Sequence, residues 1–146
     1  NNRPGYLLIG DLALLHDLNG LIASKLQSAD MTIVVMNNDG GNLLRITNWA
    51  GQESHPTWSP DGRRITFTSD LNGTDGIYVI NTENLVITKN TERGWHPVWS
   101  PDGRRIAFTS DRDGDKDIYV MNNDGTGVVR LTNNAAEDSD PSWSPK

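Results

Sequence analysis

The sequence contains no cysteine. This absence excludes disulfide bonds, zinc sites built from thiolates and catalysis by a thiol, and it leaves the redox compartment open. No hydrophobic run approaches the roughly 20 residues that a membrane-spanning helix needs. The first residues, NNRPGYLLIGDLALL, also lack the order of regions found in a signal peptide. We therefore expect no membrane insertion.

Positive charge is scarce as well, since 13 Lys and Arg stand against 19 Asp and Glu, for a net charge of −6. Nucleic-acid binding needs a concentrated basic surface, so we expect no nucleic-acid partner. The sequence has no Gly-x-Ser-x-Gly motif, and no serine beside His16, His55 or His96 stands in a nucleophile context. We therefore predict a protein that is not an enzyme.

What the sequence does have is an internal repeat with a period of about 42 residues. The stretch HPTWSPDGRRITFTSD (55–70) returns as HPVWSPDGRRIAFTSD (96–111), and its start returns again as DPSWSPK (140–146). The unit 95–133 contains four short runs rich in apolar residues, with a Pro-Asp-Gly turn after the first and an Asn-Asp-Gly turn before the fourth. The pattern predicts a four-stranded antiparallel meander per unit.

Such a sheet has apolar residues on both faces, so it cannot bury them alone and must stack against its neighbours. No interval between units is long enough for a crossover helix. The sequence therefore predicts an all-β protein, a β-propeller of four-stranded antiparallel blades with about three blades per chain.

The phrases WSPDGRRIAFTSDRDGDKDIYVMNNDG (99–125) and HPTWSPDGRRITFTSD closely resemble the blades of TolB-like propellers, also called WD-repeat-like or PD repeats. The resemblance is specific over residues 31–146 and weak over residues 1–30. It implies the fold, and it implies function only weakly, because the repeat motif mostly serves packing. In that family the blades form the six-bladed domain of periplasmic TolB and the propeller domains of several prolyl-oligopeptidase-like enzymes. A periplasmic or extracellular location is slightly favoured by this resemblance alone.

The repeat divides the chain into four parts. Residues 1–48 are a divergent first blade, 54–90 the second, 95–133 the third, and 139–146 a closing strand that would complete a blade with N-terminal strands. Within the first blade, residues 4–11 take the second-strand position and 12–29 form an insertion with helical spacing. The alternative places LIASKL, with Ile22, in that position and leaves YLLIGD as an extra strand.

Three blades are too few to close a ring, because propellers have roughly 4 to 8. We predict a homodimer of two half-rings with six blades, in which the closing strand of each chain pairs with the other chain. The alternatives are a fragment of a longer protein, a half that pairs with a different protein, or an engineered half.

Three candidate site residues share one repeat position. His55, His96 and Asp140 each precede a proline, at steps of 41 and 44 residues. Equivalent positions on innermost strands surround a propeller's channel, so these side chains would face it. Imidazole and carboxylate groups bind divalent metals, and related propellers use histidines at the channel mouth in this way. The alternative, which we favour, is that His-Pro only opens the strand; no cofactor is required.

Two other patterns have structural explanations. The loop SDRDGDKD alternates carboxylates as calcium ligands often do, but it lacks the spacing of an EF-hand, and a solvated turn is the better interpretation. The carboxylates of this loop are Asp111, Asp113, Asp115 and Asp117.

Trp58, Trp99 and Trp143 recur with the repeat and are expected in the core between blades rather than in a sugar-stacking row.

These observations predict a non-catalytic propeller scaffold that binds a protein or peptide and assembles with itself. The alternatives are a metal-dependent channel site, enzymatic or sugar-binding, and a propeller fragment without independent activity. The identity of any ligand cannot be read from the residues.

Overall fold

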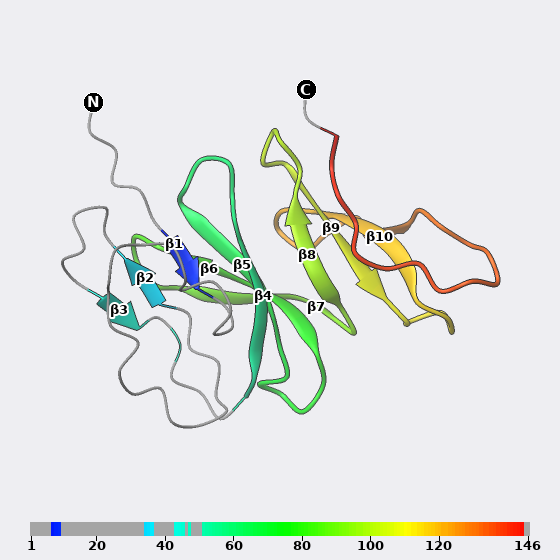
Figure 1. Ribbon diagram of the computed structural model, residues 1–146, viewed down its shortest axis with the longest axis horizontal. Coiled ribbons are helices and arrows are strands. Elements are labelled where there is room, and N and C mark those ends of the chain that lie inside the picture. The colour runs from blue at the N-terminus through cyan, green and yellow to red at the C-terminus, as the bar shows by residue number, and fades with distance from the viewer. Residues whose placement is uncertain (1–6, 10–33, 37–42, 46, 48–50, 145–146) are drawn as a thin grey trace.

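The computed structural model of the chain describes residues 7–9, 34–36, 43–45, 47 and 51–144. These residues form three antiparallel sheets, each a meander of strands that follow one another in sequence (Figure 1). Their order is β1-β2-β3, β4-β5-β6-β7 and β8-β9-β10-β11. The strands are β1 Leu7–Ile9, β2 Val34–Met36, β3 Leu43–Arg45, β4 Glu53–Trp58, β5 Arg64–Ser69, β6 Gly76–Asn81, β7 Ile87–Glu92, β8 Trp95–Trp99, β9 Arg105–Ser110, β10 Asp117–Asn122 and β11 Val129–Arg130.

The second and third sheets are the two repeat units, and the same turn connects their first two strands. In the second sheet the N–H of Gly62 donates to the carbonyl of Ser59 at 2.9 Å, and Gly62 has φ 70°. Asp61 accepts hydrogen bonds from the Ser59 hydroxyl at 2.5 Å and from the N–H of Arg63 at 3.1 Å. Glycine is suited to the positive φ, and the short carboxylate satisfies donors of the turn. This is the Pro-Asp-Gly turn that the sequence predicts.

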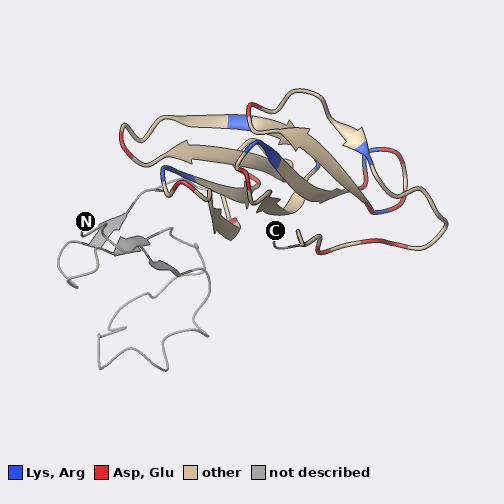
Figure 2. Cartoon of the chain, turned by 90° about the horizontal axis from the view of Figure 1, so that it is seen from above, with Lys and Arg blue, Asp and Glu red and all other residues tan. Residues whose placement is uncertain are grey.

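The two sheets pack face to face across an apolar core. From the second sheet, β6 contributes Ile77 and Val79, and the third sheet contributes the rest of the cluster. Burial of these side chains is the main stabilisation of the pair, because each sheet covers apolar surface that the other would expose to water. Charged residues lie mostly in turns and at strand ends (Figure 2). The third sheet's members of this core are Trp99, Ile106, Phe108, Tyr119 and Met121.

The second sheet also buries its opposite face. Along β6, Tyr78 and Ile80 alternate with Ile77 and Val79 of the first core, and Ile65 and Phe67 of β5 join them on the opposite face; all four are at most 2% exposed. Period-two alternation places the two sets on opposite faces of the strands. This sheet therefore has apolar residues on both faces, which is the property that requires stacking in a propeller.

The first sheet comprises β1, β2 and β3, and Leu8 pairs with Val35, which pairs with Leu44. Its strands lie in the segments that the sequence assigns to the first blade, and their membership of a blade stays a prediction. The predicted insertion 12–29 and most of the residues on which the alternative strand assignment depends lie outside the described residues.

The C-terminal residues are predicted to form a strand by pairing with another copy of the chain, which a single chain does not test. Residues 139–144 form no strand, and 145–146 lie outside the described residues. A strand needs a partner edge, and no described strand pairs with this segment. The predicted closing strand is therefore not a strand in the single chain, although its side chains dock as described below. Among the described residues, no helix has the length and hydropathy of a membrane span.

Candidate functional site

The innermost strands of the two repeat units share an unusual backbone feature. His55 in β4 has φ 51°, His96 in β8 has φ 51°, and Asp140 in the C-terminal segment has φ 57°. The strand pairing shifts register at the first two of these positions, between Ser54 and Thr57 and between Trp95 and Val98. A left-handed residue followed by proline, which has no N–H to donate, produces a bulge in each strand.

These bulges bring the three predicted channel residues together in a row. The rings of His55 and His96 lie with their centroids 4.1 Å apart and their planes at 56°. Nδ1 of His96 lies 2.6 Å from Oδ1 of Asp140. The backbone N–H of Asp140 in turn donates to the Thr109 hydroxyl at 3.2 Å. Each side chain of the row therefore contacts the next, from β4 to β8 and then to the C-terminal segment.

The electrostatics of the row favour a neutral imidazole at its start. Partial desolvation lowers the pKa of His55 most, although the residue stays exposed at the surface; the neighbouring His96 lowers the pKa further, while Asp140 opposes the shift. The Asp140 side chain is 70% exposed, and it accepts a hydrogen bond from the Ser139 hydroxyl at 2.7 Å. The row thus offers imidazole edges and a carboxylate to a ligand.

The geometry is a row rather than a converging ligand set. Within the described part of the chain, no group of three His, Asp or Glu is arranged to hold a metal ion. In this structure His96 directs Nδ1 to Asp140, which leaves Nε2 as the ring nitrogen available to a ligand. A metal at His55, His96 and Asp140 stays a prediction.

The repeated tryptophans pack against the faces of the two four-stranded sheets. Trp99 is 8% exposed in the core between the two sheets, and Trp58 packs against the cluster on the other face of the second sheet. Trp143 docks on the third sheet, where its indole N–H donates to the carbonyl of Val98 at 3.2 Å. Trp143 thus contacts other residues of this chain, as expected for a residue that serves packing.

The four loop carboxylates do not converge on one point. Asp117 is fully buried, where Arg130 donates to it and the Thr132 hydroxyl donates at 3.0 Å. The Tyr119 hydroxyl donates to Asp113 at 2.7 Å, Asp111 lies 3.8 Å from Arg93, and Asp115 is exposed. The calcium interpretation finds no support in this arrangement, because each carboxylate that has a contact serves a different partner. The solvated-turn interpretation is wrong for Asp117, whose side chain anchors an outer strand.

Two arginines that follow the Pro-Asp-Gly turns lie over tryptophan rings. The guanidinium of Arg64 lies over the Trp99 ring at 4.7 Å, and that of Arg105 over the Trp143 ring at 5.2 Å. The cation is attracted by the ring's π-electrons. The sequence contains a signal for these contacts. Arg64 precedes Trp99 by 35 residues and Arg105 precedes Trp143 by 38 residues, so each arginine lies about one unit before the tryptophan that it contacts. Sequence reasoning did not use this signal because the contact depends on how blades stack.

Solved structures share this arrangement. A protein assigned as TolB from Agrobacterium tumefaciens is 31% identical and has a TM-score of 0.69, over 80% of this chain and 43% of that one. TolB from Acinetobacter baumannii is 26% identical with a TM-score of 0.65, over 74% and 28%. An oligogalacturonate lyase in complex with manganese is 25% identical with a TM-score of 0.58, over 71% and 29%. The stacked four-stranded meanders are therefore those of a β-propeller.

A match to a protein-family model indicates which kind of β-propeller this is. Residues 83–146 match the model of the TolB beta propeller domain, PD40. The chain is therefore similar to TolB-like propeller repeats over these residues, as its motifs predict. The predicted six-blade count and dimer are not established by these comparisons.

The chain is also similar to a second, different group of proteins. A 2-succinyl-5-enolpyruvyl-6-hydroxy-3-cyclohexene-1-carboxylate synthase from Lysinibacillus sphaericus is 54% identical over 55 residues, which is 38% of this chain. The chain spans only a tenth of that synthase, and less than half of either TolB structure.

Proposed function

We propose that the protein is a non-catalytic β-propeller scaffold that binds a protein or peptide at its channel. The observation that carries this proposal is the row of His55, His96 and Asp140, in which one repeat position presents hydrogen-bonding side chains along successive innermost strands. Imidazole and carboxylate edges at a channel suit the amide groups of a peptide.

Panning a displayed peptide library on the purified chain tests this proposal. Selected peptides should bind His96→Asn more weakly than the original chain, because the variant removes the central imidazole. Arg63→Ala should bind them unchanged, since Arg63 is exposed and forms only a surface ion pair with Glu83. Failure to select any peptide, or equal binding by both variants, would contradict a peptide site at this row.

We also propose that a second copy of the chain completes the ring. The C-terminal segment supports this, because Trp143 sits over Arg105 as Trp99 sits over Arg64, so residues 139–144 take the place of a next blade's first strand. Its backbone lacks a strand partner among the described residues, and strands from a second copy would supply one. Further blades from a longer chain or from another protein are the alternative sources.

The solution mass distinguishes these sources. Light scattering at several protein concentrations should give twice 16.1 kDa, and this mass should persist on dilution. A stable and soluble monomer would contradict the homodimer and leave the row as an open arc that awaits blades from elsewhere.

A metal-dependent channel site is the second candidate function. It is favoured by the contact of two imidazoles and a carboxylate in one row, and by the similarity to a lyase whose structure contains manganese. Elemental analysis of the purified protein and calorimetric titration with Mn²⁺ test it. Stoichiometric metal that is lost in His96→Asn would support this function, and a metal-free protein that does not bind Mn²⁺ would exclude manganese at the row.

The synthase similarity does not lead us to propose that enzyme's activity. The matched part amounts to 10% of the synthase from Lysinibacillus sphaericus. An enzyme's activity depends on residues held together by its whole fold, so a tenth of the length is a poor basis for transferring it.

A further inference from the structure

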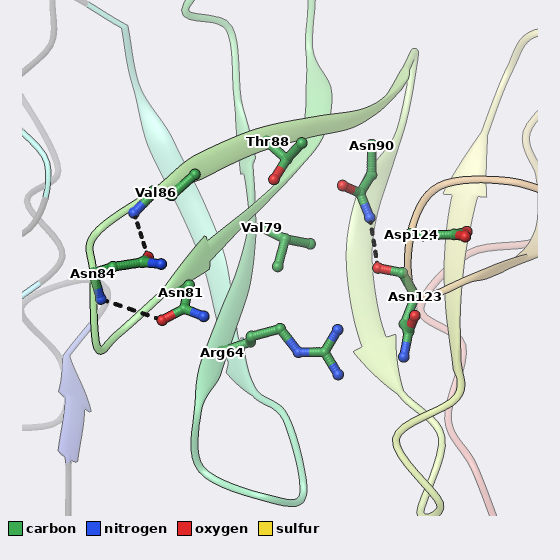
Figure 3. Close-up of a pocket in the computed structure, with 9 residues that line it drawn as sticks. All are labelled: Arg64, Val79, Asn81, Asn84, Val86, Thr88, Asn90, Asn123 and Asp124. Carbon is green, nitrogen blue, oxygen red and sulfur yellow. Dashed lines mark hydrogen bonds between the residues drawn. The ribbon is translucent and has the colours of Figure 1, made fainter.

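A pocket of about 340 Å³ lies between the outer parts of the two four-stranded sheets, away from the channel row (Figure 3). Val79 and Asn81 of β6 and Thr88 and Asn90 of β7 line it, so alternate residues of two neighbouring strands form its floor. The turn between β10 and β11 lines it from the third sheet. Its volume falls within the range of about 300–1,000 Å³ that is typical of small-molecule sites.

Arg64 is the cation of this pocket. Its guanidinium is stacked on Trp99 and points into the space between the lining residues (Figure 3). Among the described residues, its side chain donates no hydrogen bond and forms no ion pair within 4 Å, although its charge acts on Asp61, whereas Arg112 and Arg130 both donate to protein oxygens. The N–H groups of the Arg64 fork are therefore free to bind a carboxylate in a bidentate manner.

Asn81 and Asn84 add hydrogen-bond donors to those of Arg64. Oδ1 of Asn81 accepts the N–H groups of Glu83 at 2.8 Å and Asn84 at 3.3 Å. Oδ1 of Asn84 accepts the N–H of Val86 at 3.0 Å. Because both side-chain oxygens are occupied by the turn, their NH₂ groups are what these residues can offer to a ligand.

The opposite side of the pocket offers acceptors. The side-chain NH₂ of Asn90 donates to the carbonyl of Asn123 at 3.1 Å, and that of Asn123 donates to the carbonyl of Gly103 at 2.8 Å. Their Oδ1 atoms are therefore the groups left for a ligand. Oδ1 of Asp124 accepts two hydrogen bonds from Thr126, which lower the pKa of Asp124 and keep it ionised, and its Oδ2 adds a charged acceptor.

We propose that this pocket binds a small hydroxy-carboxylate. The carboxylate pairs with Arg64 and the NH₂ groups of Asn81 and Asn84, and the hydroxyl groups donate to Asn90, Asn123 and Asp124. The negative charge of Asp124 disfavours a ligand that is anionic throughout, such as phosphate. The pocket shares no residue with the channel row, so this proposal and the proposed peptide site can fail independently.

Titration with sodium gluconate, followed by NMR of side-chain N–H signals, tests the proposal. The Arg64 Nε–H and the Asn81 and Asn84 amide signals should shift and saturate. Glucose lacks the carboxylate and propionate lacks the hydroxyl groups, so each should bind at least about tenfold more weakly than gluconate. Sodium phosphate should bind no better than propionate.

The repeat supplies the matched control. Arg64→Ala should weaken gluconate binding by at least about tenfold, because it removes the charged, bidentate donor. Arg105→Ala removes the equivalent arginine, which is stacked on Trp143 and lies outside the pocket, and should leave the affinity within about twofold. Arg64→Lys should recover only part of the binding, since an ammonium lacks the planar fork.

Thr88→Glu tests whether binding can be lost without loss of stability. Thr88 is exposed, so its replacement puts a negative charge into the pocket without changing the core. It should abolish gluconate binding while the unfolding midpoint stays unchanged. No saturable shift with gluconate, equal effects of the Arg64 and Arg105 variants, or unimpaired binding by Thr88→Glu would each overturn the proposal.

Discussion

At positions 55, 96 and 140, one side chain has to suit both the backbone conformation and the contacts of the row. The backbone of each residue has a positive φ, a region in which Asn, Asp and His are enriched and β-branched residues are outliers. The same side chains contact one another along the channel row. Residue type alone therefore cannot separate a backbone role from a ligand role at this position of the repeat.

Substitutions at His96 separate these roles. His96→Asn and His96→Val both lose the contacts with His55 and Asp140, but only valine is poorly tolerated at φ 51°. We expect His96→Val to be less stable than His96→Asn by about 1–2 kcal/mol in urea unfolding. Equal stability of the two variants would show that the positive φ is not required at this bulge.

His55 makes the stability of the fold depend on pH. Its pKa is lowered in the folded chain, mainly by partial desolvation, so the unfolded chain binds this proton more tightly. The resulting penalty is absent above the ordinary histidine pKa of about 6.5 and grows as the pH falls below it. The groups that face His55 are His96, which adds to the shift, and Asp140, which opposes it.

His55→Asn removes this titration and keeps a residue that tolerates the positive φ. Urea unfolding at about pH 7.5 and about pH 5.5 should show a smaller loss of stability in the variant than in the original chain. A loss of the same size in both proteins would show that other groups cause the pH dependence.

At the scale of the element, the outer strand β11 depends on one buried ion pair. This strand has only two residues, and Arg130 joins it to the fully buried Asp117 of β10. Arg130→Ala would leave the buried carboxylate of Asp117 without its cation, although the arginine itself is partly exposed. We expect the free energy of unfolding to fall by clearly more than it does when an exposed ion pair is removed.

Lys116→Ala is the control for this prediction, because Lys116 pairs with Glu137 on the surface at 3.6 Å. Exposed ion pairs contribute about 0–1 kcal/mol, so its unfolding curve should change little. Replacing Asp117 by Asn in the Arg130→Ala background should restore part of the stability, since it removes the unpaired charge. A loss equal to that of Lys116→Ala would contradict the buried pair.

The elements also show how far sequence reasoning reaches. The meander of the second and third units followed from local signals, because Pro-Asp-Gly turns and alternating apolar residues act within a few residues of each other. The stack of Arg64 on Trp99 and the buried role of Asp117 depend on contacts across blades or strands, which periodicity does not encode. Their distances in sequence are 35 and 13 residues. The positive φ at the His-Pro positions was likewise missed, because an X-Pro dipeptide is ordinarily extended.

At the scale of the whole molecule, the proposed six-blade ring needs residues 1–48 to be a blade. The described strands of this part pair in the order β1-β2-β3, as a meander should. The similarity to synthases reaches 60% identity over 42 residues in one case. Either the first sheet is a blade of the ring, or it is a separate unit.

Hydrogen exchange in a destabilised variant decides between these possibilities. Phe67 is fully buried on the face of the second sheet opposite the third, where a preceding blade would pack. Phe67→Leu should lower the stability of the propeller modestly, because it reduces buried apolar surface and leaves a small void. If the first sheet is a blade, the amide protons of Val35 and Leu44 should exchange faster in this variant, together with those of β5 and β6. Unchanged exchange at these two residues would contradict the first blade and leave two blades and the docked C-terminal segment in each chain.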